Sequence, residues 1–218
     1  MSLKEKIKIP KYTLGEEIFS SITHGVGALL SIAALVLCVV FSAIHKNAYA
    51  VVASAIYGST SIILYVMSTL YHAFKINNAK RVLRIIDHCS IFLLIAGTYT
   101  PYALVALPKT LGWVIFSINW GCAVIGIILN SIDLERYKKI SIVLYLLMGW
   151  MIIFSYNSLV ASVPFGGLCF MFIAGFLYTF GIIIYAVGKK IKYMHSIFHL
   201  FTLAASICFF FSIFFYVI

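Results

Sequence analysis

Residues 18–44 read IFSSITHGVGALLSIAALVLCVVFSAI and contain no lysine, arginine, aspartate or glutamate. A helix needs about 20 predominantly apolar residues to cross the hydrocarbon core of a bilayer. The apolar residues here form a continuous run and do not alternate with polar ones, which favours a helix over a strand of a membrane barrel. This stretch therefore predicts an all-α membrane protein.

Six further stretches have the same character, so we expect a seven-transmembrane helix bundle. The predicted spans are 18–44, 49–73, 85–107, 111–131, 140–158, 164–188 and 193–218. The whole chain is 63% apolar and only 10% charged, whereas soluble domains carry about 25% charged residues. We assign residues 1–17 to a basic cytoplasmic N-terminal segment and residues 18–218 to one seven-helix transmembrane domain.

The net charge of +10 does not indicate a nucleic-acid partner, because the basic residues form short clusters between apolar runs. Fourteen of them fall on one predicted side of the membrane and two, Lys46 and Lys109, on the other. The fourteen are Lys4, Lys6, Lys8, Lys11, Lys75, Lys80, Arg81, Arg84, Arg136, Lys138, Lys139, Lys189, Lys190 and Lys192. The positive-inside rule then predicts a cytoplasmic N-terminus and an extracellular C-terminus. We expect a multi-pass plasma-membrane protein whose partners are membrane lipids.

Two further features of the sequence exclude other classes. The first apolar run is too long for a cleavable signal and no Ala-x-Ala site follows it, so we expect the N-terminus to be retained. The cysteines lie in apolar segments without a CxxC pair, so we expect small buried side chains and no disulfides. They are Cys38, Cys89, Cys122, Cys169 and Cys208.

Apart from tyrosines and cysteines, the ionisable residues inside the predicted spans gather at one depth. With the predicted orientation, all of them lie within about two helical turns of the cytoplasmic face: His24, His72, Asp87, His88, His195 and His199. Buried ionisable groups are costly in a bilayer and need partners. This convergence is the main functional signal in the sequence.

The spacing of these residues predicts a metal site. His195 and His199 are four residues apart, so both imidazoles project from one helix face. Together with His72 they provide three neutral nitrogen ligands, an arrangement used for catalytic Zn²⁺ with water in the fourth position. Asp87 could hydrogen-bond that water or take its proton, and Ser68 could orient a ligand or stabilise a developing charge. Alternatively, each histidine could be an ordinary packing residue, and Asp87 could cap its helix or pair with Arg84.

Other polar residues near this depth receive separate predictions. His88 lies about 100° around the helix from Asp87, so we expect it to face elsewhere. Glu17 and His24 could form a second polar pair near the site. Thr13-x-x-Glu16 predicts a capping box at the start of the first helix, and Pro101 predicts a kink in the third span.

Four motifs carry a resemblance to a known family. They are Glu16-Glu17 with Thr23-His24-Gly25, Ser68-Thr69-Leu70-Tyr71-His72, Asp87-His88 with Ala96-Gly97-Thr98-Tyr99-Thr100-Pro101-Tyr102, and His195-Ser196-Ile197-Phe198-His199-Leu200. In order and position they resemble the bacterial hemolysin III family, which belongs with the progestin and adiponectin receptors and, more distantly, the alkaline ceramidases. The resemblance covers essentially the full chain, although Ser20 stands where we expect an asparagine.

The resemblance implies a zinc site near the cytoplasmic face, with His72, His195 and His199 as ligands, Asp87 holding the bound water and Ser68 in the same pocket. The leading functional hypothesis is a ceramidase-like, zinc-dependent hydrolase of a lipid amide or related bond. The second is a receptor-like sensor of membrane state that uses its zinc structurally. A lytic pore is a third hypothesis, disfavoured because the chain lacks secretion features and a charged pore lining. A proton-coupled transporter is disfavoured because the ionisable residues line only the inner end.

Overall fold

A computed structural model describes residues 7–187 and 191–218. Lys4, Lys6, Lys189 and Lys190, which contributed to the predicted orientation, lie outside the described residues. The described chain is helical, with short connections. Its helices are α2 (Leu14–His45), α3 (Ala48–Ala73), α4 (Asn78–Pro101), α5 (Lys109–Trp150), α6 (Tyr156–Ser162), α7 (Phe165–Val187) and α8 (Met194–Tyr216). A π-helix, Tyr102–Ala106, extends α4, and a 3-10 helix, Met151–Ser155, separates α5 from α6.

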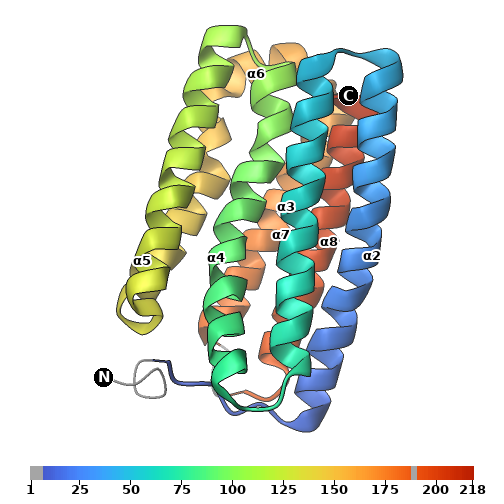
Figure 1. Cartoon of the computed structure of the whole chain (residues 1–218). Helices are drawn as coiled ribbons and strands as arrows, with labels where there is room; N and C mark the ends of the chain where they lie inside the picture. The colour runs from blue at the N-terminus through green and yellow to red at the C-terminus, as the bar shows by residue number, and fades with distance from the viewer. Residues whose placement is uncertain (1–6, 188–190) are drawn as a thin grey trace.

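Six segments of the described chain are long and apolar enough to cross a membrane. They are Leu14–His45, Ala48–Ala73, Asn78–Ala106, Lys109–Ser162, Phe165–Ala186 and Met194–Tyr216. These segments confirm the predicted all-α membrane class. Their arrangement as a bundle is shown in Figure 1, where the start of α2 and the end of α8 lie at opposite ends.

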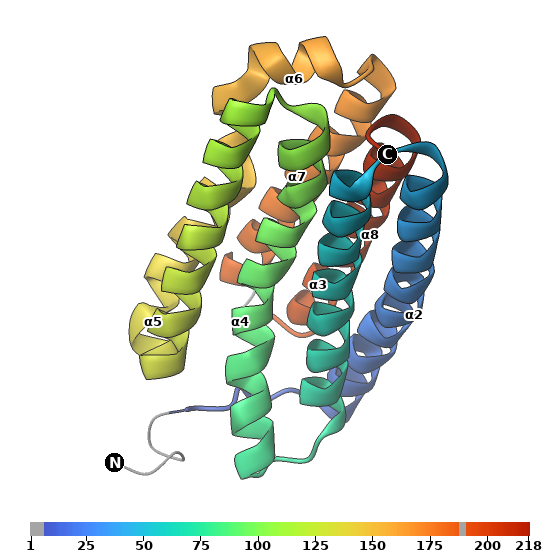
Figure 2. The ribbon, with the colours of Figure 1, turned by 45° about the horizontal axis from the view of Figure 1, so that its top comes forward.

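The segment Lys109–Ser162 contains both the predicted span 111–131 and the predicted span 140–158. Its helix α5 is interrupted at Asp133, whose backbone is extended (φ −159°, ψ 95°). The Asp133 carboxylate accepts the backbone N–H of Arg136 at 3.0 Å, as expected of a residue that caps a new helix. Figure 2 shows α5 turning back at the end of the bundle where α2 begins.

Hydrogen bonds join the two limbs of α5 in antiparallel register. The Ser141 hydroxyl donates to Asn130 Oδ1 at 2.6 Å, and Asn119 Nδ2 donates to the Met148 carbonyl at 3.4 Å. Both amides are buried, and a buried amide needs such partners. The two limbs therefore pack side by side along their length.

The predicted capping box at the start of α2 is confirmed. The Thr13 N–H donates to Glu16 Oε2 at 2.8 Å, and the Glu16 N–H donates to Thr13 Oγ1 at 3.4 Å. Glu16 Oε1 also accepts the Tyr193 N–H at 2.7 Å. This carboxylate consequently fixes the start of α2 beside the start of α8.

Close packing of α2 against α3 depends on Gly27. A Cβ atom at this position would lie 2.5 Å from the Tyr65 ring, so only glycine allows the two helices their present separation. Tyr65 is fully buried, and its hydroxyl donates to Ser206 Oγ at 2.7 Å. One tyrosine therefore links α3 both to α2 and to α8.

At Pro101, where a kink was predicted, the structure shows a change of helix type. After Pro101 the chain winds as a π-helix, in which the Leu107 N–H donates to the Tyr102 carbonyl at 3.0 Å. The Thr100 hydroxyl donates to the Ala96 carbonyl at 2.8 Å. All five cysteines are free. Cys38 and Cys89 are buried, as expected, whereas Cys122, Cys169 and Cys208 are half-buried.

Candidate metal centre and cavity

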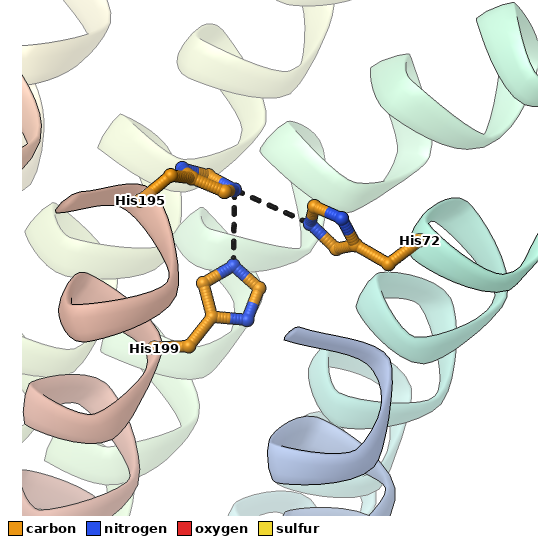
Figure 3. Close-up of side chains that lie close together, drawn as sticks. All are labelled: His72, His195 and His199. Atoms are coloured by element: carbon orange, nitrogen blue, oxygen red, sulfur yellow. Dashed lines mark hydrogen bonds between the residues drawn. The ribbon is translucent and has the colours of Figure 1, made fainter. Parts of the chain in front are cut away.

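Three histidines from helices distant along the chain converge at one end of the bundle. His72 lies in the last turn of α3, and His195 and His199 lie in the first turns of α8. Figure 3 shows their ring nitrogens pointing toward a common centre. His195 Nε2 lies 3.2 Å from His72 Nε2 and 3.1 Å from His199 Nε2, and one ligand atom from each ring falls within 4.8 Å of the others.

This arrangement fits a metal ion better than a hydrogen-bonded cluster. A neutral imidazole carries one N–H, and each ring nitrogen is either a donor or an acceptor. His195 Nε2 faces two other Nε2 atoms, so it can make a favourable hydrogen bond with only one of them. A cation at the common centre would accept all three lone pairs at once, and three imidazoles suit zinc with one open position.

Asp87 and Ser68, the other predicted site residues, lie beside this triad. Their side chains interact with each other, and both line a cavity of about 130 Å³ together with His195 and His199. Ser68 is buried and lies one helical turn before His72. The structure therefore brings all five predicted site residues to one end of the bundle, although their chemical roles stay predictions.

The rest of the cavity is largely apolar and extends away from the histidines. Its lining passes along Tyr145 and Leu146 of α5 and Tyr178 of α7, and reaches Trp150 and Phe209. The Trp150 indole N–H donates to Thr179 Oγ1 at 3.0 Å, which joins α5 to α7 at this depth. A polar end that carries the candidate metal site thus continues into an apolar interior.

The segment before α2 covers the polar end of the cavity. The Tyr12 ring stacks on His195 with 4.8 Å between ring centroids and 14° between planes, and Pro10 also lines the cavity. Arg84 holds this segment through the Lys8 carbonyl. Burial raises the pKa of Tyr12 above its ordinary value, so the phenol stays a neutral group over the site.

The expected pair of Glu17 with His24 does not form. Glu17 Oε2 instead lies 2.7 Å from His72 Nδ1, and Glu17 Oε1 accepts from Lys80 Nζ at 2.6 Å. His24 lies two turns deeper and stacks on His199, with 3.7 Å between ring centroids. The helical spacing of Glu17 and His24 did not predict their partners, because each residue contacts side chains of other helices.

The expectation for His88 was also wrong, since His88 lines the same cavity as Asp87. The cavity is wide enough to be lined by consecutive residues of α4. Arg84, the alternative partner of Asp87, pairs with Glu135. The sequence placed Glu17 near the site but gave it the wrong partner, and no spacing rule indicated Lys80 or Tyr12. The contacts of these residues join segments that are distant along the chain.

Comparison with known proteins shows the family of this chain. The model of the family described as Haemolysin-III related matches residues 12–210. A hemolysin-3 homolog of Bacillus subtilis (strain 168) is 42% identical over 205 residues, which cover 94% of this chain and 96% of the relative. Hemolysin-3 of Bacillus cereus is 38% identical over 216 residues, with 99% and 98% covered. The monocyte to macrophage differentiation factor of Homo sapiens is 26% identical over 217 residues, with 93% and 85% covered. The chain therefore belongs to the haemolysin-III-related family of integral membrane proteins.

Proposed function

We propose that this protein is a zinc-dependent hydrolase of a lipid amide or related bond at the cytoplasmic side of the plasma membrane. The observation that carries the proposal is the position of the histidine triad, with Asp87 and Ser68 beside it, at the polar end of a largely apolar cavity. A lipid whose scissile bond lies close to its headgroup would match this division between a polar and an apolar end.

The proposed topology has seven crossings, with the N-terminus inside and the C-terminus outside. The reversal of α5 at Asp133 supports two crossings within Lys109–Ser162. The clustering of lysine and arginine at alternate connections supports the orientation. The candidate metal centre then lies near the inner membrane surface, because α3 ends and α8 begins on that side.

Zinc bound by His72, His195 and His199 would supply a Lewis acid that polarises the scissile carbonyl and lowers the pKa of water. Asp87 accepts a proton from the attacking water as its oxygen forms the new bond to the carbonyl carbon. When the carbon–nitrogen bond breaks, Asp87 passes that proton to the leaving amine. The single Ser68 O–H orients the ionised Asp87 carboxylate before the reaction. Once Asp87 has taken the proton, the same O–H is released to donate to developing negative charge. The products are a fatty acid and an amine.

The experiment that tests this proposal uses purified protein in lipid nanodiscs, loaded with zinc and offered ceramide-like and phospholipid substrates. We expect zinc-dependent turnover in the wild type, and loss of turnover in Asp87→Asn with zinc retained. The matched control is Asp133→Asn, which removes a carboxylate from the α5 turn and should keep its activity. Retained turnover in Asp87→Asn would contradict the assignment of Asp87.

One observation favours a second candidate, a receptor-like sensor of membrane state with a structural zinc. The triad joins α3 to α8, two helices whose histidines are 123 residues apart in the chain. A metal at this position would fasten the end of α3 to the start of α8. Absence of turnover over a broad lipid panel, with unfolding on zinc removal, would support this candidate. The Bacillus relatives are named hemolysins, so dye release from liposomes should be measured in parallel as the test of a lytic pore.

A further inference from the structure

Lys80 is an unusual residue in this part of the bundle because it is a buried lysine, with only 1% of its surface exposed. Lysine is almost never fully buried unless it is paired. Lys80 lies in the first turn of α4, where Asn77 caps its backbone N–H at 2.8 Å. Its ammonium group donates to Glu17 Oε1 at 2.6 Å and to the Phe74 carbonyl at 3.0 Å.

The same carboxylate contacts the candidate metal centre. Glu17 Oε2 lies 2.7 Å from Nδ1 of His72, whose side chain is fully buried. The two oxygens of Glu17 are therefore divided between Lys80 and His72. This contact path begins at the N-terminal turn of α4, passes through α2 and ends at the ring that α3 contributes to the triad.

We propose that Glu17 and Lys80 are a positioning pair that prepares His72 to bind the metal. This inference rests on the metal site of the proposed function. The ionised Glu17 accepts the Nδ1–H of His72, which leaves the lone pair of the imidazole on Nε2, the atom that faces His195. A carboxylate partner on the far nitrogen of a ligating histidine fixes its tautomer and its orientation and raises its basicity as a ligand.

Lys80 has a separate part in this arrangement. Its ammonium group binds Glu17 Oε1 and so directs that oxygen away from His72, which leaves Oε2 aimed at Nδ1. Because Lys80 also holds the Phe74 carbonyl just after α3, it joins the carboxylate to the end of the helix that carries His72. The pair therefore restrains both the ring and the helix end from which the ring projects.

The test measures zinc affinity by competition with a coloured chelator, using full-length protein in nanodiscs, and needs no substrate. We expect Glu17→Gln to weaken zinc binding about 10- to 100-fold, the usual effect of removing such a partner. Lys80→Met should weaken it in the same direction, and Lys80→Arg should restore part of the loss. Lys75→Met removes an exposed lysine from the same connection and should bind zinc like the wild type.

The double variant Glu17→Gln with Lys80→Met separates positioning from simple stability. Glu17→Gln alone leaves a buried ammonium group without its ion pair, which destabilises the fold. The double variant removes both charges, so its melting temperature without metal should recover. A positioning role predicts that zinc affinity stays low, because a neutral amide is a weaker acceptor for Nδ1–H. The Co²⁺ absorption spectrum should also change, because it reports ligand geometry.

The outcomes distinguish this inference from the proposed function. If the wild type binds no zinc, both fail. If the wild type binds zinc and the double variant regains both stability and full zinc affinity, the pair is only structural and the inference is overturned. Wild-type affinity in Glu17→Gln would overturn it as well, while leaving the zinc site and the hydrolase proposal in place.

Discussion

Gly149 offers a direct way to ask whether the apolar part of the cavity holds a lipid chain. Gly149 lines the cavity, and a Cβ atom added to it would meet no other atom within 4 Å. A leucine at this position should therefore extend into empty space without displacing its neighbours. Its four side-chain carbons would exclude about four methylene groups of a bound acyl chain.

The expected loss follows from the transfer free energy of those methylene groups. At about 0.8 kcal/mol each for transfer from water, excluding four of them costs about 3 kcal/mol, or about 200-fold in the dissociation constant expressed against the free aqueous ligand. The assay is the binding of a water-soluble, short-chain fluorescent N-acyl amide to Gly149→Leu in nanodiscs, titrated by its free concentration in water, with bound zinc measured in the same samples. Zinc content should equal that of the wild type because the triad is not touched.

Gly121→Leu is the matched control for this substitution. A Cβ atom at Gly121 also meets no atom within 4 Å, but Gly121 is exposed on the surface of α5 and lies outside the cavity lining. Both variants gain the same helix propensity, so only the cavity distinguishes them. Equal lipid affinity in the two variants would refute the assignment of the cavity to an acyl chain.

Three further predictions concern the triad, its cover and the helix packing. The double variant His195→Ala with His199→Ala should lose bound zinc, measured by elemental analysis, whereas His45→Ala at the end of α2 should keep it; zinc retained by the double variant would exclude the triad as the site. Tyr12→Ala should speed the removal of zinc by a chelator because the ring stacked on His195 is lost, and exposed Tyr156→Ala should not; equal rates would mean that Tyr12 does not restrict access. Gly27→Ala should lower the free energy of unfolding by about 1–3 kcal/mol because its Cβ would lie 2.5 Å from Tyr65. Gly25→Ala is the control, since its Cβ has its nearest contact at 3.8 Å; equal melting temperatures of the two variants would show that α2 shifts without cost.

Much of the fold could be predicted because the bilayer restricts the choice of structure. Long uncharged runs such as 18–44 have no alternative to a helix in hydrocarbon, and Thr13 with Glu16 marks the start of that helix locally. The helical conformation of the reversal in α5 could not be predicted. Residues 132–139 carry the charges of a connection, yet they are almost entirely helical. Only Asp133 leaves the helical conformation there.

The candidate site could be predicted in part for a similar reason. His72, His195 and His199 stood out because ionisable residues are rare in apolar spans, and their common depth followed from the alternating direction of the spans. Depth does not determine the angular position of a side chain around its helix. The partners of Glu17 and the inward position of His88 depended on how helices rotate against one another, which short-range spacing does not record.

A catalytic zinc and a structural zinc at the triad have the same effect on thermal stability. A metal that binds only the folded state stabilises it by about 2.7 kcal/mol when free metal is 100 times the dissociation constant, whether it is catalytic or structural. Since the triad joins α3 to α8, either role predicts that a chelator lowers the melting temperature. Asp87 separates the two roles because it lies in the cavity outside the group of three ligands. If the zinc is only structural, Asp87→Asn should leave the sensor function of the protein unchanged. If the zinc is hydrolytic, the same substitution should abolish turnover at unchanged zinc content.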